Sequence, residues 1–451
     1  MEEFLQSFVE KQVGVAQEKN KIDPSWYQKF NVKRGLRNTD GTGVLVGLTE
    51  IGDVHGYILD ENDKVPVQGR LMYRGIDIND LVQGFQDDGR FGFEETVYLL
   101  LFGELPNKTA LEEFNKILGR CRDLPDHFTE DMILKFPSPD IMNKLARSVL
   151  VSYSFDKDPD SLDIANVLRQ CIELIARFPT LAAYAYQAKS HYFNDTSLFL
   201  HSPQPELSTA ENLLYMMRAD KQYTDIEAEL LDLALVMHAE HGGGNNSAFS
   251  VHVVSSSDTD TYSAIAAAIG SLKGPKHGGA NIRVRNMIEN IKENVSDWTD
   301  DEEIANYLRK IIRKEAFDKT GLVYGMGHAV YTLSDPRAKL LKDKAEKLAS
   351  DKNKEKEFTL YKKIEALTPD LFREEKNSDK VISANVDFYS GFVYSMLNIP
   401  PELYTPIFAI ARIAGWTAHR IEELISGGRI MRPAYKSVAS KRNYTALKDR
   451  K

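Results

Sequence analysis

The sequence predicts a mainly α-helical protein with one small β element near its N-terminus. Helical patterns dominate after residue 75, whereas short extended runs are confined to the segment from Gly43 to Arg70. A length of 451 residues indicates about two domains. A strongly charged stretch also separates two less charged parts of the chain. We therefore expect a large, discontinuous helical domain of residues 1–276 and 387–451 and a small domain of residues 277–386.

The N-terminal segment carries the strands that we expect. Residues 1–42 are polar with weak helical patterning, and we expect them to dock on the surface in a role that the sequence does not define. Short extended runs follow at 44–46, 56–59 and 65–67, around the turn-like residues 60–63. Together these runs predict the small β element.

Most of the remaining chain has helical patterning. The segment that starts at residue 93 is very apolar, above all at 97–101, and stops at Gly103, which predicts a buried helix. A helix of small side chains is expected at 262–270, and Gly274-Pro275 ends it. Further helices are expected near 108–122, 139–155, 161–177, 178–190 and 208–218, separated in part by proline-containing breaks.

The helix that begins at Asp225 leads to a histidine at a position where its apolar stripe would continue. Thr224 and Glu227 have the spacing of a capping box, and apolar residues then recur every three to four positions. One more step of four reaches His241, which is followed by three glycines. Glycine lets a helix end in left-handed geometry and lets the backbone approach another group closely. A ligand pocket is one interpretation, and a core histidine satisfied by a carbonyl is the other.

Helices are also expected throughout the C-terminal part of the chain. His277 precedes an amphipathic helix, and further helices are expected to begin at Thr299, at Asp335-Pro336, at Asp387 and near Leu403. The many charges between residues 292 and 380 are expected to form solvated helix faces.

Composition excludes several classes of function. A net charge of −9 argues against general binding to nucleic acid or membrane surfaces. The two cysteines, Cys121 and Cys171, form neither a disulfide framework nor a metal-cluster spacing, which favours a reducing compartment. No apolar run approaches the roughly 18–20 residues of a membrane helix, and the acidic N-terminus does not resemble a targeting peptide. We therefore expect a cytoplasmic protein.

Polar side chains at helix starts and glycine-rich bends are the candidates for chemistry. Asp387 alone is most simply an N-cap, and the glycines around Met326 lack the lysine of a nucleotide-binding loop. Arg412 lies on an apolar helix face and requires an anionic partner. Together the candidates form a set of histidines, arginines and one carboxylate. Arginines bind carboxylates bidentately, imidazoles polarise carbonyls and a carboxylate accepts a proton, so this set could bind a small dicarboxylic acid and act on it. Its members are His277, His328, Asp387, Arg337, Arg412 and Arg432.

These residues lie in motifs that resemble the Si-type citrate synthases, from Gly43 to about Tyr435. The matching stretches occur in order at 238–247, 274–281, 325–331, 335–337, 385–391 and 411–416. The resemblance implies a homodimer with a nearly all-α fold, in which a small domain closes over the substrate. It also implies condensation of acetyl-CoA with oxaloacetate, followed by hydrolysis of the thioester, with no covalently bound cofactor and no metal.

The resemblance also implies a role for each catalytic residue. Asp387 takes a proton from the acetyl methyl group, His277 hydrogen-bonds the thioester oxygen, and His328 polarises the ketone of oxaloacetate and supplies its proton. A methyl group beside a thioester is a very weak acid, so the base needs help at the oxygen where charge develops. A helix N-terminus disfavours imidazolium, which predicts a neutral His277.

Binding residues follow from the same resemblance. His241, Arg337 and Arg412 resemble the groups that hold oxaloacetate, and Arg432 resembles an arginine donated across the dimer. The CoA-binding residues are the ones that carry over least well from the family to this sequence. Basic residues near the motifs fit a role as solvated surface residues equally well. The candidates for these contacts are Lys276, Arg283 and Lys380. Ser383-Ala384 stands where many relatives have Tyr-Pro, so the approach to Asp387 is expected to differ slightly.

Three alternatives remain open. A 2-methylcitrate synthase would use propionyl-CoA with the same residues, and one methyl group gives only about 1–3 kcal/mol of discrimination. A metal-dependent hydrolase would use His238, Glu240 and His241, completed by His277 or His328, although this spacing lacks the HExxH arrangement. A non-catalytic helical scaffold is the third, although every expected catalytic side chain is present.

Overall fold

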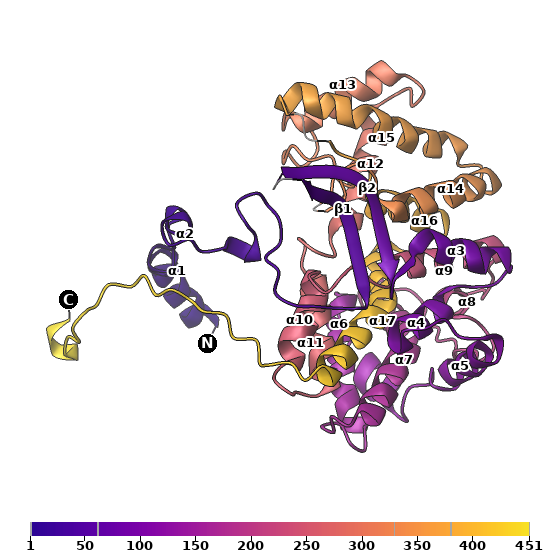
Figure 1. Cartoon of the computed structure of the whole chain (residues 1–451), viewed down its shortest axis with the longest axis horizontal. Helices are drawn as coiled ribbons and strands as arrows, with labels where there is room; N and C mark the ends of the chain where they lie inside the picture. The colour runs from indigo at the N-terminus through magenta and orange to yellow at the C-terminus, as the bar shows by residue number, and fades with distance from the viewer. Residues whose placement is uncertain (1, 61–62, 329, 379–380, 451) are drawn as a thin grey trace. The chain divides into compact units, whose positions relative to one another are not determined.

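The computed structural model describes residues 2–60, 63–328, 330–378 and 381–450. It divides into two units, Met1–Leu48 and Thr49–Lys451. The larger unit is a body of helices with one small sheet, which confirms the prediction of a mainly α-helical fold (Figure 1). Within the described ranges, no helix has both the length and the apolar character needed to cross a membrane.

The first unit consists of short helical segments. It holds α1 (Glu2–Lys19), α2 (Ser25–Lys29) and a 3-10 turn at Arg34–Leu36. The strand expected at 44–46 is absent from this described segment, so that prediction is wrong. Leu45 is 88% exposed. A strand is stabilised by hydrogen bonds to a partner strand and by packing of one face, and residues 44–46 have neither in the described structure.

The second unit begins with a three-stranded antiparallel sheet in the order β1 (Gly52–Asp60), β2 (Asp63–Tyr73) and β3 (Ile76–Asp77). This confirms the extended runs at 56–59 and 65–67. Part of the expected turn, residues 61 and 62, lies outside the described residues.

Two glycines of this sheet lie directly against the loop that leads into α14. A side chain at Gly56 would place its Cβ 2.5 Å from the carbonyl oxygen of Val330, and one at Gly69 would collide with that of Ser334. Thr332 donates to the Gly56 carbonyl at 3.2 Å, so backbone contacts hold the sheet and the loop together. Glycine is required at both positions because the backbones approach closely.

The helices between residues 78 and 217 confirm most of the expected elements. They are α3 (Ile78–Asp87), α4 (Phe93–Phe102), α5 (Lys108–Arg120), α6 (Ile141–Ser152), α7 (Ile164–Asn194) and α8 (Thr209–Met217). The two helices expected at 161–177 and 178–190 are one continuous helix with Pro179 inside it. Pro179 and its neighbours are buried, and this packing outweighs the loss of one backbone hydrogen bond.

The next three helices lead into the candidate site. α9 (Asp225–His238) has the predicted capping box of Thr224 and Glu227. The helix ends at His238, so the expectation that His241 continues its buried stripe is wrong, and Gly242 adopts a positive φ of 82° instead. α10 (Asn246–Ser255) was not expected, whereas α11 (Thr261–Lys273) contains the predicted small side chains.

The remaining helices show which residues cap them. They are α12 (Ala280–Asn294), α13 (Asp301–Ile312), α14 (Pro336–Asp351), α15 (Glu355–Lys376), α16 (Val386–Met396) and α17 (Tyr404–Ile425). Asp335 caps α14 as predicted. Asp300 rather than Thr299 caps α13, and Asn385 rather than Asp387 caps α16. In both cases the cap is the residue directly before the first helical residue, whose side chain reaches the free N–H groups of the first turn, whereas Thr299 lies one residue too early and Asp387 already lies inside its helix. α15 was not expected.

Helix α17 lies in the core of the second unit. It contacts α7, α10, α4, α9 and α11, and in Figure 1 it runs among them in yellow. Trp416 and Arg412 are buried almost completely on this helix. A buried arginine in an apolar core requires a local partner, and the site described next explains its position.

Candidate active site

The loop that carries His328 is hydrogen-bonded to the segment ahead of Asp387. Gly325 and Gly327 have positive φ angles of 79° and 88°. The backbone N–H of Asn385 donates to the Gly325 carbonyl at 2.8 Å, and its side-chain amide donates to the Gly327 carbonyl, also at 2.8 Å. These bonds join two segments about sixty residues apart in the sequence.

The hydrogen bonds of His328 determine its tautomer. Its Nδ1 accepts from the backbone N–H groups of Val330 at 3.0 Å and Tyr331 at 3.2 Å. The proton of the neutral ring therefore lies on Nε2. Burial, reinforced by the charge of Arg337, lowers the pKa of His328 to about 4. At neutral pH this ring is an uncharged N–H donor.

His241 and Arg337 gather with His328 around Tyr331. The ring centroid of His241 lies 5.2 Å from that of His328, and the His328 ring stacks on Tyr331 at 4.8 Å. The guanidinium of Arg337 lies 5.5 Å from the centroid of Tyr331. Among the described residues the buried Nε2 of His241 has no hydrogen-bond partner, which favours the ligand-pocket interpretation over a satisfied core histidine.

Arg337 is held in place by its neighbour Asp335. Its Nε and Nη2 donate to the two carboxylate oxygens of Asp335 at 3.0 and 2.8 Å, and both side chains are buried. One of these oxygens also accepts the backbone N–H of Val386 at 3.1 Å. The pair therefore fixes the guanidinium relative to the first turn of α16, where Asp387 lies.

Arg412 is buried but only partly satisfied. Its Nε donates to the His238 carbonyl at 2.6 Å, while Nη1 and Nη2 have no hydrogen-bond partner within the described part of the chain. Its guanidinium carbon lies 4.6 Å from the ring centroid of Phe408. Burial lowers the pKa of Arg412 to about 10, so it remains charged at neutral pH. Two free donors on a buried cation suit a carboxylate ligand.

Asp387 lies in the first turn of α16 with its carboxylate free of the capping role. Asn385 accepts the Asp387 backbone N–H at 3.0 Å and acts as the cap. Burial raises the pKa of Asp387 to about 6, and the charges of Arg337 and Arg412 oppose that rise. A carboxylate with a raised pKa is a stronger base than one in water and remains ionised at neutral pH.

His277 lies in the turn ahead of α12. Its Nε2 lies 3.0 Å from Ser247 Oγ, which also accepts the Trp416 indole N–H at 3.0 Å. Burial, followed by the charge of Arg412, lowers the pKa of His277 to about 4. The predicted neutral ring is therefore correct, but burial rather than the helix terminus is its main cause. Asn245 Oδ1, at 3.0 Å, and His277 Nε2 both lie within reach of the single Ser247 hydroxyl proton, and when that proton goes to Nε2 the proton of the neutral ring lies on Nδ1.

The other predicted site residues lie apart from this cluster. Arg432 is exposed in the irregular segment that follows α17. Lys276 and Arg283 are also exposed, and the guanidinium of Arg283 lies 5.4 Å from the Tyr324 ring centroid. Lys380 lies outside the described residues.

A cavity of about 340 Å³ opens beside His328. Its lining residues come from separate segments, so no local pattern in the sequence could have predicted it. They are Leu322, Val323, Met326, Gly327, His328, Phe372 and Ile382. A larger cavity of about 820 Å³ lies elsewhere, among α4, α5, α9 and α14, and none of the predicted site residues line it.

Glu240 does not join the metal site that the hydrolase alternative requires. Its buried carboxylate accepts the Gly242 backbone N–H and lies 3.1 Å from His419 Nε2. Across the described ranges, the one group of metal-binding side chains with ligand atoms within 4.8 Å of one another is His252, His419 and Glu422. The set of His238, Glu240 and His241 is therefore not assembled.

Comparisons with known proteins agree with these motifs. A family model described as the C-terminal domain of citrate synthase matches residues 38–434. The chain is 34% identical to a citrate synthase of Haloferax volcanii, covering 93% of this chain and 97% of that protein. It is also 30% identical to a 2-methylcitrate synthase of Shewanella oneidensis, covering 81% of this chain and 87% of that protein.

Solved structures give the same result for the fold. A citrate synthase structure from Pyrobaculum aerophilum matches with a TM-score of 0.73 at 29% identity, covering 90% of this chain and 94% of that one. A ternary complex of carboxymethyl coenzyme A and oxaloacetate with citrate synthase from Thermoplasma acidophilum matches with a TM-score of 0.72 at 26% identity. The match covers 92% of this chain and 99% of that one.

Proposed function

The chain belongs to the citrate synthase family, and from this premise we propose that it condenses acetyl-CoA with oxaloacetate and hydrolyses the resulting thioester to citrate and CoA. The observation that carries the assignment of the site is Arg412, a buried cation with two guanidinium nitrogens that have no hydrogen-bond partner among the described residues. Arg337 and two histidines with depressed pKa values accompany it. A doubly charged carboxylic acid would satisfy these donors.

The first step is proton removal from the acetyl group. Asp387 takes a proton from the methyl carbon, the electrons of that C–H bond move toward the thioester oxygen, and this oxygen takes up the N–H proton of His277, so that an enol forms. His277 donates an N–H to this oxygen, and Ser247 holds the imidazole in the required tautomer. A neutral donor placed where charge develops lowers the barrier without binding the ground state tightly.

Carbon–carbon bond formation follows. The enol carbon attacks the ketone carbon of oxaloacetate, while His328 Nε2–H hydrogen-bonds the ketone oxygen and supplies its proton. The product is the citryl thioester. Water then attacks its carbonyl, the C–S bond breaks, and CoA leaves as the thiol together with citrate.

Oxaloacetate is proposed to bind between the two buried arginines and His241. We assign its carboxylates to Arg412 and Arg337 and a polar contact to His241. The exposed position of Arg432 supports its donation to a neighbouring subunit in a homodimer, so that each site would also contain Arg432 of the partner subunit. The two free nitrogens of Arg412 support a bidentate contact.

The cavity beside His328 supports a route for the thioester arm of CoA. Its apolar lining suits the uncharged part of that arm, and its position beside His328 supports an approach of the arm to the reacting groups. Lys276 and Arg283 are exposed candidates for the CoA phosphates. The proposed chemistry uses only side chains, the two substrates and water. The unpaired cysteines fit a cytoplasmic location.

Closure of a small domain, residues 277–386, over the remainder would complete the site. His328 and Arg337 belong to this segment, whereas His241, Asp387 and Arg412 belong to the large part. A site divided in this way forms fully only when the two parts meet. Closure would exclude water during carbon–carbon bond formation and limit wasteful hydrolysis of acetyl-CoA.

A 2-methylcitrate synthase is the second candidate, because a relative with that name is 30% identical over 371 residues. The test is thiol release from acetyl-CoA and from propionyl-CoA, each with and without oxaloacetate. We expect release that depends on oxaloacetate and is fastest with acetyl-CoA. A preference for propionyl-CoA would favour the second candidate, and no release that depends on oxaloacetate would contradict both.

A further inference from the structure

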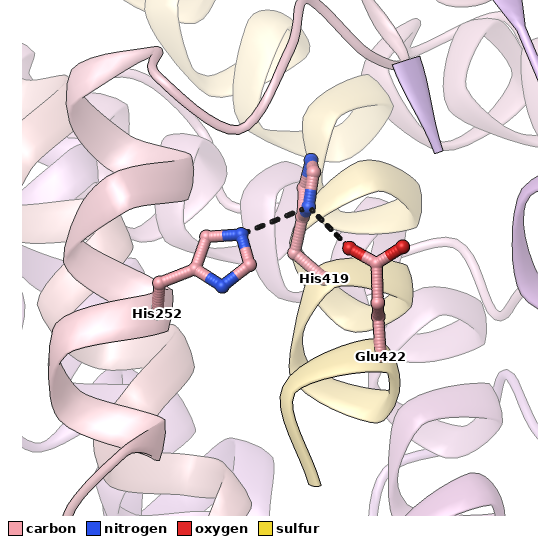
Figure 2. A group of neighbouring side chains, drawn as sticks. All are labelled: His252, His419 and Glu422. Atoms are coloured by element: carbon pink, nitrogen blue, oxygen red, sulfur yellow. Dashed lines mark hydrogen bonds and ion pairs between the residues drawn. The ribbon is translucent and has the colours of Figure 1, made fainter. Parts of the chain in front are cut away.

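Two histidines and a glutamate that the proposed reaction does not use form a compact group. His252 comes from α10, and His419 and Glu422 come from α17, one helical turn apart (Figure 2). His252 Nε2 and His419 Nδ1 face each other at 3.1 Å, and Glu422 Oε2 lies 3.8 Å from His419 Nδ1. The ligand atoms of all three side chains lie within 4.8 Å of one another.

The outer nitrogen of each ring is paired with a carboxylate. His252 Nδ1 lies 2.8 Å from Glu423 Oε2, and His419 Nε2 lies 3.1 Å from Glu240 Oε1. Metal-binding histidines have this same arrangement, in which the nitrogen away from the metal donates to a carboxylate that fixes the tautomer and orients the ring. Both rings are thereby oriented with a nitrogen toward the centre of the group.

Glu422 contributes an oxygen that accepts no hydrogen bond from the described residues and lies at ion-pair distance from His419. Its Oε1 accepts the backbone N–H of Glu50 at 2.8 Å, which anchors the carboxylate. Its Oε2 is buried and has no hydrogen-bond partner among the described residues. A buried carboxylate oxygen without a donor is unfavourable, and a cation at the centre of the group would satisfy it.

We propose that His252 Nε2, His419 Nδ1 and Glu422 Oε2 bind one divalent transition-metal cation of the zinc type. Zinc bonds of about 2.0–2.2 Å at tetrahedral angles set neighbouring ligand atoms roughly 3.3 Å apart. The 3.1 and 3.8 Å separations lie close to that value, and the third pair, His252 Nε2 and Glu422 Oε2, lies within 4.8 Å, so binding requires Glu422 to rotate toward His252. Two imidazoles and one carboxylate favour zinc, nickel or copper over magnesium or calcium.

The site lies apart from the substrate cluster and would have a structural role. The side chains of His252 and Glu422 are 10% and 15% exposed, so the group lies near the surface, and a water molecule would occupy the fourth coordination position of a bound ion. A bound cation would link α10 to α17. Through Glu240, which also accepts the Gly242 N–H, it would support the turn that carries His241.

Zinc binding to the full-length protein tests the proposal directly. Protein stripped with a chelator is titrated with zinc chloride in a non-coordinating buffer and followed by calorimetry. We expect one saturable site per chain and a rise in Tm on the order of 2–4 °C at a hundredfold excess over Kd. Cobalt added in place of zinc is expected to give the intense visible absorption of a four- or five-coordinate ion.

Matched variants identify the ligands. His252→Gln is expected to weaken zinc binding at least a hundredfold, and Glu423→Gln about 10–100-fold, because Glu423 only orients the ring. His127→Gln removes an exposed histidine elsewhere and should leave binding unchanged. Circular dichroism confirms that each variant is folded. If His252→Gln does not fold, Glu423→Gln and the cobalt spectrum decide. No saturable binding, or equal binding by all variants, would overturn the proposal.

Discussion

Two regions of the site differ in how fully the hydrogen-bond donors of their buried arginine are satisfied. At the starts of α14 and α16, Arg337 is locked to Asp335 by two hydrogen bonds, and Asp335 is bonded in turn to the backbone at Val386. On α17, Arg412 is equally buried but keeps two guanidinium nitrogens without partners among the described residues. The first region is organised before substrate arrives, whereas the second has binding capacity that only a ligand can satisfy.

The difference suggests that the Arg337 region mainly stabilises the fold, whereas Arg412 mainly contributes affinity for the ligand. A buried ion pair in good geometry holds its surroundings rigid, and removing one partner leaves an uncompensated charge. A buried cation with free donors weakens the unliganded fold but binds an anion strongly, since the donors are already desolvated. The same substitution should therefore have different consequences in the two regions.

The largest effect is expected at Asp387, the one group of the organised region that is proposed to react. Asp387→Asn should lower kcat by about 10²–10⁴, the usual contribution of a positioned general base. The KM for oxaloacetate should change little, because the arginines and His241 remain. Steady-state thiol release measures both constants, and near-normal turnover would remove Asp387 from its proposed role.

The next effect concerns the stability of the organised region. Arg337→Met should lower the free energy of unfolding by about 3–5 kcal/mol, since Asp335 would remain buried without its partner. Denaturant unfolding measures this loss. A double variant with Asp335→Asn should recover part of it, and a single variant as stable as the parent would contradict the comparison.

The opposite result is expected on α17. Arg412→Met should leave the stability of the free protein unchanged or higher, because it removes a buried charge with unpartnered donors. It should weaken oxaloacetate binding about 10–100-fold, the worth of a charged hydrogen-bond pair. Thermal shift with and without oxaloacetate checks both expectations. A loss of stability equal to that of Arg337→Met would show that the two arginines do not differ.

The smallest effect is the pH dependence of the base. Burial raises the pKa of Asp387 to about 6, so the reactive carboxylate predominates above that pH and is lost as the pH falls through it. Activity should therefore fall about tenfold for each pH unit below 6. The residual activity of Asp387→Asn should lack this limb, and an identical profile in both proteins would assign the titration to another group.

Local signals in the sequence predicted local structure well. Thr224 with Glu227 and Asp335 with Pro336 marked helix starts because capping uses residues within one turn. The motif residues His241, His328, Arg337, Asp387 and Arg412 were found because short stretches identify the family. Capping by Asn385 rather than Asp387 was missed, since both residue types can cap and only the backbone geometry decides between them.

Contacts between distant segments could not be predicted. His252 and His419 are 167 positions apart, and nothing near either residue signals the other. The continuity of α7 through Pro179 depends on burial by other helices, which outweighs the local preference for a break. The cavity beside His328 likewise needs Leu322 and Phe372 in its lining, and only the folded chain brings these two residues together.

The close contact between the sheet and the His328 loop has a consequence for how this protein can vary. Gly56 and Gly69 carry no chemistry, yet any side chain there would push against the carbonyls of Val330 or Ser334. A saturation library should therefore tolerate few replacements at these two positions. Directed evolution for new acyl-CoA substrates would gain more from Phe372 and Ile382, two apolar residues that line the cavity from outside that loop.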